Sequence, residues 1–167
     1  MPSQALIDAM MATVPQRNER ARHFHEANRG LNLTPQEQAL YGRHLTNLYG
    51  AGGVDNPDGS RSSLYQAVEE HGGKFYDIPT VWDGKIQTEK WTHPQTGKVW
   101  DIPNQQALQN VERAGWDSFP SYTTPEQADA RYGQMHDYME KDTGDYFDAA
   151  GAKRRQMLID AMARGGR

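Results

Sequence analysis

Residues 63–82 read SLYQAVEEHGGKFYDIPTVW and carry the clearest structural signal in the chain. Two β-prone runs, 63–69 and 74–82, lie on either side of the turn sequence Glu70-His71-Gly72-Gly73. Glycines between such runs are typical of a β-hairpin, because glycine reaches the positive φ that a tight turn needs. Residues 64–71 taken alone also fit a short helix. The stretch therefore predicts a hairpin, with a short helix as the alternative for its first half.

Further turn signals surround this hairpin. Asp83-Gly84 predicts a second tight turn. Residues 90–100 predict a second hairpin, in which two tryptophan-bearing stretches flank a Pro-x-x-Gly turn. Residues 50–60 are mostly glycine, asparagine, aspartate, proline and serine, so they predict a loop. The centre of the chain should hold a small antiparallel sheet with an aromatic core.

Helix signals flank the β-rich centre. Thr34-Pro35-Gln36-Glu37 supplies an N-cap, a proline at the first helical position and a capping-box glutamate. Thr124-Pro125-Glu126-Gln127 has the same design and predicts a helix over 125–140. Residues 104–114 predict another helix, which Gly115 ends. The predicted fold class is α+β, with a small antiparallel β-hairpin sheet packed with helices and flanked by N- and C-terminal helical arms.

The N-terminal arm is predicted from apolar spacing. Residues 3–13 place apolar side chains on one helical face, and Pro15 should end that helix. Residues 16–28 predict a solvated helix that stops at Gly30. The helix that starts at Thr34 completes the N-terminal part of the chain.

The C-terminal arm is predicted to be separate from the helix before it. Thr143-Gly144 interrupts the pattern, and a short helix should follow over 153–162, with a basic first turn that opposes the helix dipole. The expected domains are an N-terminal helical arm and helix over 1–49, an α+β hairpin-and-helices module over 50–141 and a C-terminal helical arm over 142–167.

One five-residue sequence occurs in both arms: residues 6–10 and residues 158–162 both read LIDAM. A chance repeat of common helix formers is one interpretation. The other is that both arms present a methionine-rich apolar stripe to equivalent grooves on partner subunits. The candidate partner-binding residues are Leu6, Ile7, Met10, Met11, Leu158, Ile159 and Met162.

Composition excludes several classes of protein. A net charge of -4 gives no overall attraction for phosphate, which disfavours direct DNA binding. The absence of cysteine excludes disulfides and thiolate metal sites. No stretch approaches the ~20 apolar residues of a membrane span. We therefore expect a protein made in a cytoplasm.

No pattern of catalytic or metal-binding residues is convincing. His23 and His25 point about 200° apart on a helix, so they do not share one ion. Residues 55–59 resemble a fragment of a calcium loop but lack its regular oxygen ligands. Glu69, Glu70 and Asp77 could be the paired acids of a glycosidase, yet no further motif supports that activity. We expect no catalytic, cofactor-binding or metal-binding residues.

The tryptophans allow two interpretations. Trp82, Trp91, Trp100 and Trp116 lie within one short stretch, which favours the core of a small sheet-and-helix module. The alternative is a carbohydrate platform formed by Trp82, Trp91 and Trp100.

The central residues resemble a small domain that recurs in virion proteins of tailed bacteriophages. The shared features are a hairpin whose second strand contains Ile78-Pro79-Thr80-Val81, a helix that ends near Gly115, and a helix with Ala128-Asp129-Ala130. The similarity covers about half of the chain in the same order. Residues 86–103 are an insertion that departs from the family pattern.

This resemblance implies a setting and no catalytic mechanism. Members of the family occur in internal virion, ejection and large multi-domain phage proteins. We expect a virion structural or genome-ejection component, present in several copies, that contacts portal, tail or internal core subunits. It would reside in the virion, and in the host cytoplasm during assembly. The alternatives are an accessory carbohydrate-binding, peptidoglycan-binding or lytic-associated phage protein, and a non-virion regulator made during infection.

Overall fold

The chain has the predicted α+β fold in the computed structural model, which describes the backbone of residues 4–165 and the side chains of residues 15–161. At its centre, β3 (Gln66–His71) pairs antiparallel with β4 (Lys74–Pro79), and β9 (Ser121–Tyr122) pairs with the other edge of β4. Gly72 and Gly73 form the turn, with φ of 58° and 77°. The predicted hairpin is confirmed, and the short-helix alternative is wrong.

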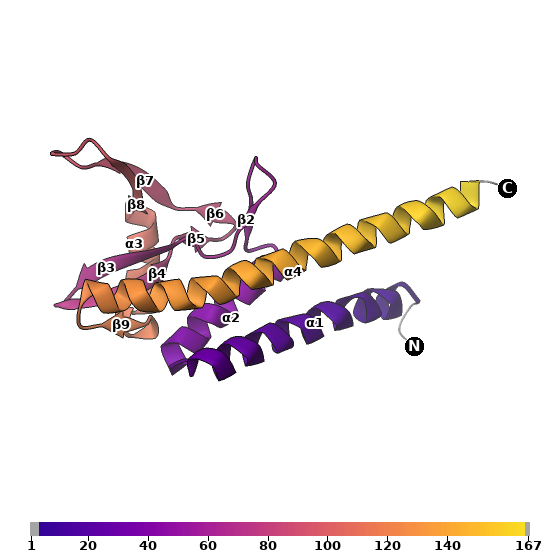
Figure 1. The fold of residues 1–167 in the computed structure, drawn as a ribbon, viewed down its shortest axis with the longest axis horizontal. Coiled ribbons are helices and arrows are strands. Elements are labelled where there is room, and N and C mark those ends of the chain that lie inside the picture. The colour runs from indigo at the N-terminus through magenta and orange to yellow at the C-terminus, as the bar shows by residue number, and fades with distance from the viewer. Residues whose placement is uncertain (1–3, 166–167) are drawn as a thin grey trace.

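Helices cover both faces of this sheet (Figure 1). On one face, Ile78 packs with Val111 of α3 (Gln105–Ala114) and with Phe119, which follows the 3-10 turn Trp116–Ser118. On the other face lies α4 (Pro125–Gly165), which contacts both β3 and β4. Because successive residues of a strand point to opposite faces, the two faces of β4 meet different helices.

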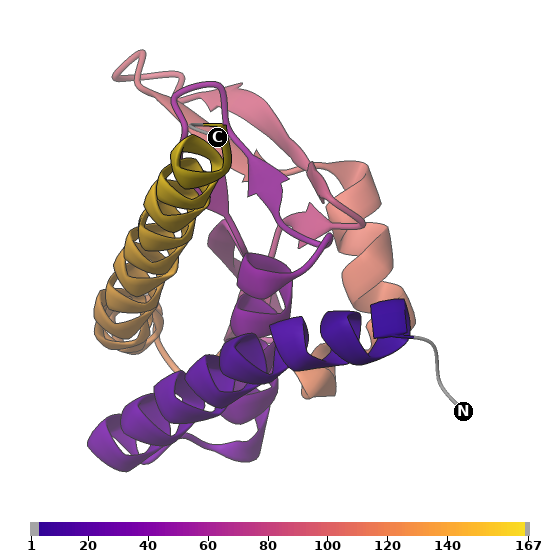
Figure 2. The same ribbon diagram turned by 90° about the vertical axis from the view of Figure 1, so that its right-hand side faces the viewer.

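Two further helices complete the body beside the sheet: α1 (Gln4–Leu31) and α2 (Pro35–Tyr49). They pack against each other and against α4, as Figure 2 shows from the side of the two chain ends. Their shared core consists of Ala27, Leu33, Leu40, Tyr41, Leu45, Leu64, Met135 and Met139. Residues before and after position 50 therefore share one core. The division of the chain at 49/50 and 141/142 into separately folding parts stays a prediction.

Glu37 joins α2 to two other elements. The predicted capping box is present, since the Thr34 hydroxyl accepts from the Glu37 N–H and the Glu37 carboxylate accepts from the Thr34 N–H. The same buried carboxylate accepts a hydrogen bond from Nε of Arg131 at 2.6 Å and another from the Tyr122 hydroxyl at 3.0 Å. Although burial opposes ionisation, these donors hold the pKa of Glu37 below its ordinary value.

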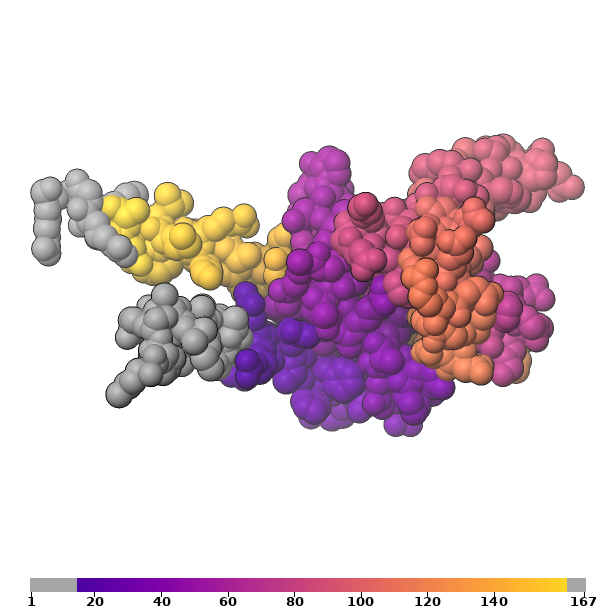
Figure 3. Space-filling view, turned by 180° about the vertical axis from the view of Figure 1, so that it is seen from behind, coloured from indigo at the N-terminus to yellow at the C-terminus, as the bar shows by residue number. Residues whose placement is uncertain are grey.

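Three two-stranded antiparallel pairs project around the central sheet: β1 (Val54–Asp55) with β2 (Arg61–Ser62), β5 (Val81–Trp82) with β6 (Lys85–Ile86), and β7 (Thr88–Thr92) with β8 (Val99–Pro103). The tight turn at Asp83-Gly84 and the second hairpin are confirmed. That hairpin extends away from the body (Figure 3). The predicted loop over 50–60 is confirmed apart from the short strand β1.

The prediction that Pro15 ends the first helix is wrong, because α1 continues through it. An interior proline removes one helical hydrogen bond and crowds the preceding turn. Packing offsets that cost, since His23 and Ala27, one turn apart, are both buried, so the second stretch is not solvated on this side. The helix ends at Leu31, one residue after the predicted stop at Gly30. Gly30 also makes room for Tyr138, whose hydroxyl would lie 2.0 Å from an added Cβ.

The helix α4 also runs further than predicted, without a break at Thr143-Gly144. The Thr143 hydroxyl donates to the carbonyl of Met139 one turn earlier, so it is satisfied within the helix. Tyr146 packs edge-on against Tyr49 of α2, with ring centroids 5.2 Å apart. These contacts hold the helix on both sides of the glycine. The prediction of a separate short helix over 153–162 is wrong.

A buried acid lies in the centre of β4. Asp77 is fully buried on the face opposite Tyr76 and Ile78. Its Oδ2 accepts a hydrogen bond of 2.7 Å from Gln66, and its Oδ1 has no partner among the described residues. Burial raises the pKa of Asp77 to about 8, against the opposing effect of the Gln66 hydrogen bond. The carboxyl is therefore protonated in the folded protein at neutral pH.

We predict that Asp77 makes the protein less stable as pH rises. The unfolded carboxyl ionises near pH 3.8 and the folded one at about 8, so folding takes up a proton between these values. This contribution to the free energy of unfolding is complete below the lower value and then falls by up to about 1.4 kcal/mol per pH unit. Asp77→Asn stays neutral, and it should raise the melting temperature at pH 8 but not near pH 4. Identical melting profiles against pH for the two proteins would contradict this.

Limited trypsin digestion should separate the two halves of α4. Lys153, Arg154 and Arg155 lie in a stretch whose side chains are all exposed, whereas Arg131 and Lys141 lie where α4 packs on the body. Proteases cut where the backbone opens locally at little cost. Mass spectrometry should find early cleavage after residues 153–155. Equally fast cleavage after Lys141 would show that the packed half of α4 is loosely held.

Candidate functional site

The C-terminal part of α4 carries the predicted partner-binding residues that the structure describes. Leu158 is 63% exposed and Ile159 58%, and the neighbouring Met157 is 62% exposed. Leu6, Ile7, Met10, Met11 and Met162 lie outside the residues whose side chains are described. The structure thus places Leu158 and Ile159 of the second LIDAM copy on an exposed helix surface, and the equivalence of the two copies stays a prediction.

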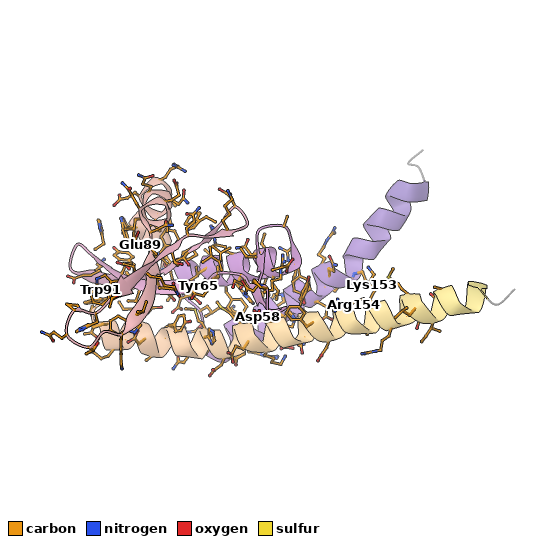
Figure 4. The ribbon with its side chains drawn as sticks, turned by 90° about the horizontal axis from the view of Figure 1, so that it is seen from above. Asp58, Tyr65, Glu89, Trp91, Lys153 and Arg154 are labelled. Atoms are coloured by element: carbon orange, nitrogen blue, oxygen red, sulfur yellow. The ribbon has the colours of Figure 1, made fainter. Side chains whose placement is uncertain are left out.

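A group of ion pairs marks the point beyond which α4 is unsupported. Arg22 of α1 contacts Asp145 of α4 at 3.2 Å, and Lys141 of α4 contacts Glu26 of α1 at 3.4 Å. Past these contacts the two helices diverge, and Figure 4 shows Lys153 and Arg154 on the free stretch of α4. We call residues 152–161 the α4 arm.

A buried carboxylate joins α1, α2 and α4 just before the arm. Asp142 is 2% exposed and accepts a hydrogen bond from the Tyr41 hydroxyl. Nδ1 of His23 lies 2.8 Å from its Oδ1, without the alignment of a hydrogen bond, and Nε2 of His44 lies 3.6 Å from its Oδ2. Burial lowers the pKa of His44, so that ring is neutral at neutral pH. We call these four residues the Asp142 cluster.

Ser63, His44 and Asp142 stand in the order of a nucleophile, a base and a carboxylate. The Ser63 hydroxyl is 2.6 Å from Nδ1 of His44. The 3.6 Å gap from His44 to Asp142 is too long for a hydrogen bond, however, and the carboxylate already accepts from Tyr41. The His44 ring is fully buried. This geometry favours a structural network that fixes the loop before β3 on α2.

Two adjoining depressions run along α4 where it faces the start of β3. One has a volume of about 500 Å³ and the other about 450 Å³, and Tyr65, Gln66 and Tyr132 line both. His136 and Glu140 border the first, and Trp100 and Asp101 border the second. We call the two depressions together the Tyr65 cleft. Figure 4 shows Tyr65 between the hairpin that carries Trp91 and the loop that carries Asp58.

Tyr65 has an unusual backbone conformation. Its φ is 47°, in the left-handed region that a bulky side chain rarely adopts. The Thr80 hydroxyl donates to the Tyr65 carbonyl, and the backbone N–H groups of Thr80 and Val81 both donate to the Leu64 carbonyl. These bonds hold the bend before β3. As a result, the Tyr65 ring is 44% exposed beside the cleft.

The tryptophans divide into two pairs. Trp82 and Trp116 are partly buried against the core around Ile78, which agrees with the core interpretation. Trp91 and Trp100 are 39% and 47% exposed and stack across the second hairpin, so the core interpretation is wrong for them. Trp82 lies on another strand pair, under the Arg43 guanidinium at 3.9 Å. The three residues of the proposed carbohydrate platform therefore do not form one surface.

The residues of the other candidate sites do not form a metal-binding or catalytic group. His23 is buried and His25 is exposed, and no group of three potential metal ligands occurs among the described residues. Asp58 accepts hydrogen bonds from the backbone and hydroxyl of Ser60, as a turn does. The strand register places Glu69 on the face opposite Asp77. Glu70 is on the same face as Asp77, but it is exposed whereas Asp77 is fully buried, so the three acids do not lie together on one surface. No helix in the described part of the chain is both long and apolar enough for a membrane span.

Sequence patterns did not reveal the Asp142 cluster or the Tyr65 cleft. The two histidines come from the consecutive helices α1 and α2, whereas Asp142 lies about 100 residues later in α4, so no local motif joins them. Comparisons of the chain with protein-family models, with curated proteins and with solved structures give no match. The exposed α4 arm and the Tyr65 cleft are the surface features of the described residues that suit a binding partner.

Proposed function

We propose that this protein is a structural or genome-ejection component of a tailed-bacteriophage virion that acts through protein–protein contacts. The observation that supports this most is the α4 arm, where Met157, Leu158 and Ile159 are exposed on a helix that extends beyond the body. A helix that projects large apolar side chains into solvent gains free energy when a groove on a partner covers them.

The gain comes from three apolar side chains on the arm. Each fully buried Leu, Ile or Met contributes about 1.5–3 kcal/mol. The arm is already helical as part of α4, which reduces the conformational entropy that binding must offset. In a symmetric particle, weak contacts of this kind are multiplied by the number of copies.

Charge suggests the chemistry of the partner. Lys153, Arg154 and Arg155 precede the apolar residues on the arm, so the complementary groove is apolar with an acidic rim. We place that groove on a neighbouring portal, tail or internal core subunit. The phage setting rests on the resemblance of the central hairpin and helices to a recurrent virion domain. The residues that carry this resemblance form β4, α3 and the start of α4.

Mass spectrometry of purified particles tests the location. The wild-type protein should be found in particles of the phage that encodes it, in several copies. If it is present in infected cells and missing from particles, the virion proposal fails and the alternative of a non-virion regulator is favoured.

A single substitution tests the arm. Leu158→Asp should leave the melting temperature of the free protein nearly unchanged, because exposed substitutions usually change stability by less than about 0.5 kcal/mol. It should strongly reduce the number of copies per particle, since a charge replaces a buried anchor in the complex.

Gln156→Asp is the matched control. Gln156 is exposed on the same arm, and two residues along a helix correspond to a rotation of about 200°, so its side chain points away from Leu158. This variant adds the same negative charge without removing an apolar side chain, and it should be incorporated normally. If both variants are incorporated like the wild type, the arm is not the contact surface.

A further inference from the structure

We propose that the Tyr65 cleft binds a neutral oligosaccharide. The proposal concerns a different surface from the α4 arm and does not depend on how the protein is assembled. We infer that the ligand is a chain of uncharged pyranose units, because the cleft combines exposed aromatic faces with hydroxyl and amide groups and has little unpaired charge.

Aromatic faces line the cleft along its length. Tyr65 is 44% exposed, and the rings of Tyr132 and His136 stack on each other at 5.4 Å. Trp100, 47% exposed, borders the far depression. Apolar faces of a pyranose ring pack on aromatic rings, and successive aromatic groups suit successive sugar units. The cleft also continues across two depressions, as an extended ligand requires.

Polar groups in the cleft are available to hydroxyl groups of a ligand. The Tyr132 hydroxyl makes no hydrogen bond to another described residue, and burial raises the pKa of Tyr132, so it keeps its proton. The Gln66 amide nitrogen donates to Asp77, which fixes the side chain and leaves its amide oxygen for a ligand. Glu140 adds a carboxylate acceptor near His136.

Charge argues against an anionic ligand. The Arg61 guanidinium at one end contacts Asp55 at 2.5 Å, and Asp101 at the other end contacts Lys90 at 2.8 Å. These pairs leave little positive potential for a phosphate or sulfate group. Glu140 would repel one. An uncharged ligand with many hydroxyl groups fits this environment best.

The strained backbone of Tyr65 supports a functional role for its ring. A bulky residue at positive φ costs stability, and such residues persist where the surrounding structure holds them. Asparagine adopts this conformation more readily than tyrosine. The Tyr65 hydroxyl donates to Oδ2 of Asp101 at 3.0 Å, a bond that asparagine is too short to make. This bond keeps the ring at the border of the cleft, where one of its faces is available to a ligand.

Isothermal titration calorimetry on the full-length protein tests the proposal. The neutral probes are chitohexaose and maltohexaose, and a heparin-derived hexasaccharide is the anionic probe. At least one neutral probe should bind saturably and change the tryptophan fluorescence, because Trp100 borders the cleft. The heparin fragment should bind more weakly. If no neutral probe binds at millimolar concentration, or if the heparin fragment binds best, the proposal is wrong.

Three variants locate the site. Tyr65→Asn should weaken binding at least about tenfold, equivalent to about 1.4 kcal/mol. Its melting temperature should stay close to that of the wild type, because relief of the strained backbone opposes loss of the hydrogen bond to Asp101. Tyr132→Phe removes only the hydroxyl and should weaken binding with little change in melting temperature. Trp91→Ala removes a ring that stacks on Trp100 without lining the cleft itself, so it should weaken binding less than Tyr65→Asn does. Loss of binding in Trp91→Ala, with normal binding in Tyr65→Asn, would place the site on the hairpin and overturn the proposal.

Discussion

The buried carboxylate of Glu37 is the contact on which the arrangement of the fold depends. It caps α2 through the Thr34 N–H and also accepts from Arg131 of α4 and Tyr122 of β9. A charge taken out of water is tolerated only when such donors surround it, so each element must stay in place for the others to be stable. The start of one helix thereby determines where the sheet edge and the long helix lie.

Asp142 repeats this arrangement further along α4. It lies about three helical turns after Arg131, and each of the two residues joins α4 to α2 through a buried carboxylate. Two fixed points on one helix set its rotation as well as its position. The same rotation directs Tyr132 and His136 toward the Tyr65 cleft. The cleft and the direction of the α4 arm therefore have a common structural cause.

Features with a local cause were predictable from sequence. Gly72 and Gly73 define the hairpin turn by their own conformational freedom, and Thr34 with Glu37 defines the start of α2 by its own hydrogen bonds. The ends of α1 and α4 were mispredicted because Pro15 and Gly144 are local signals that distant packing overrides. The candidate sites were even harder to predict from the sequence. Tyr65 adopts positive φ without being glycine or asparagine, and only its long-range hydrogen bonds explain why.

The continuity of α4 has a mechanical consequence. Asp142 is the last buried residue of α4 in the described part of the chain, and Leu158 lies about 24 Å beyond it at the rise of an α-helix. If α4 tilts as a rigid rod by about 5° around Asp142, Leu158 is displaced by about 2 Å. The helix is thus a lever whose held side, from Pro125 to Asp142, is about as long as the distance from Asp142 to Leu158. A tilt of its packed half against the body therefore reaches Leu158 as a displacement of similar size.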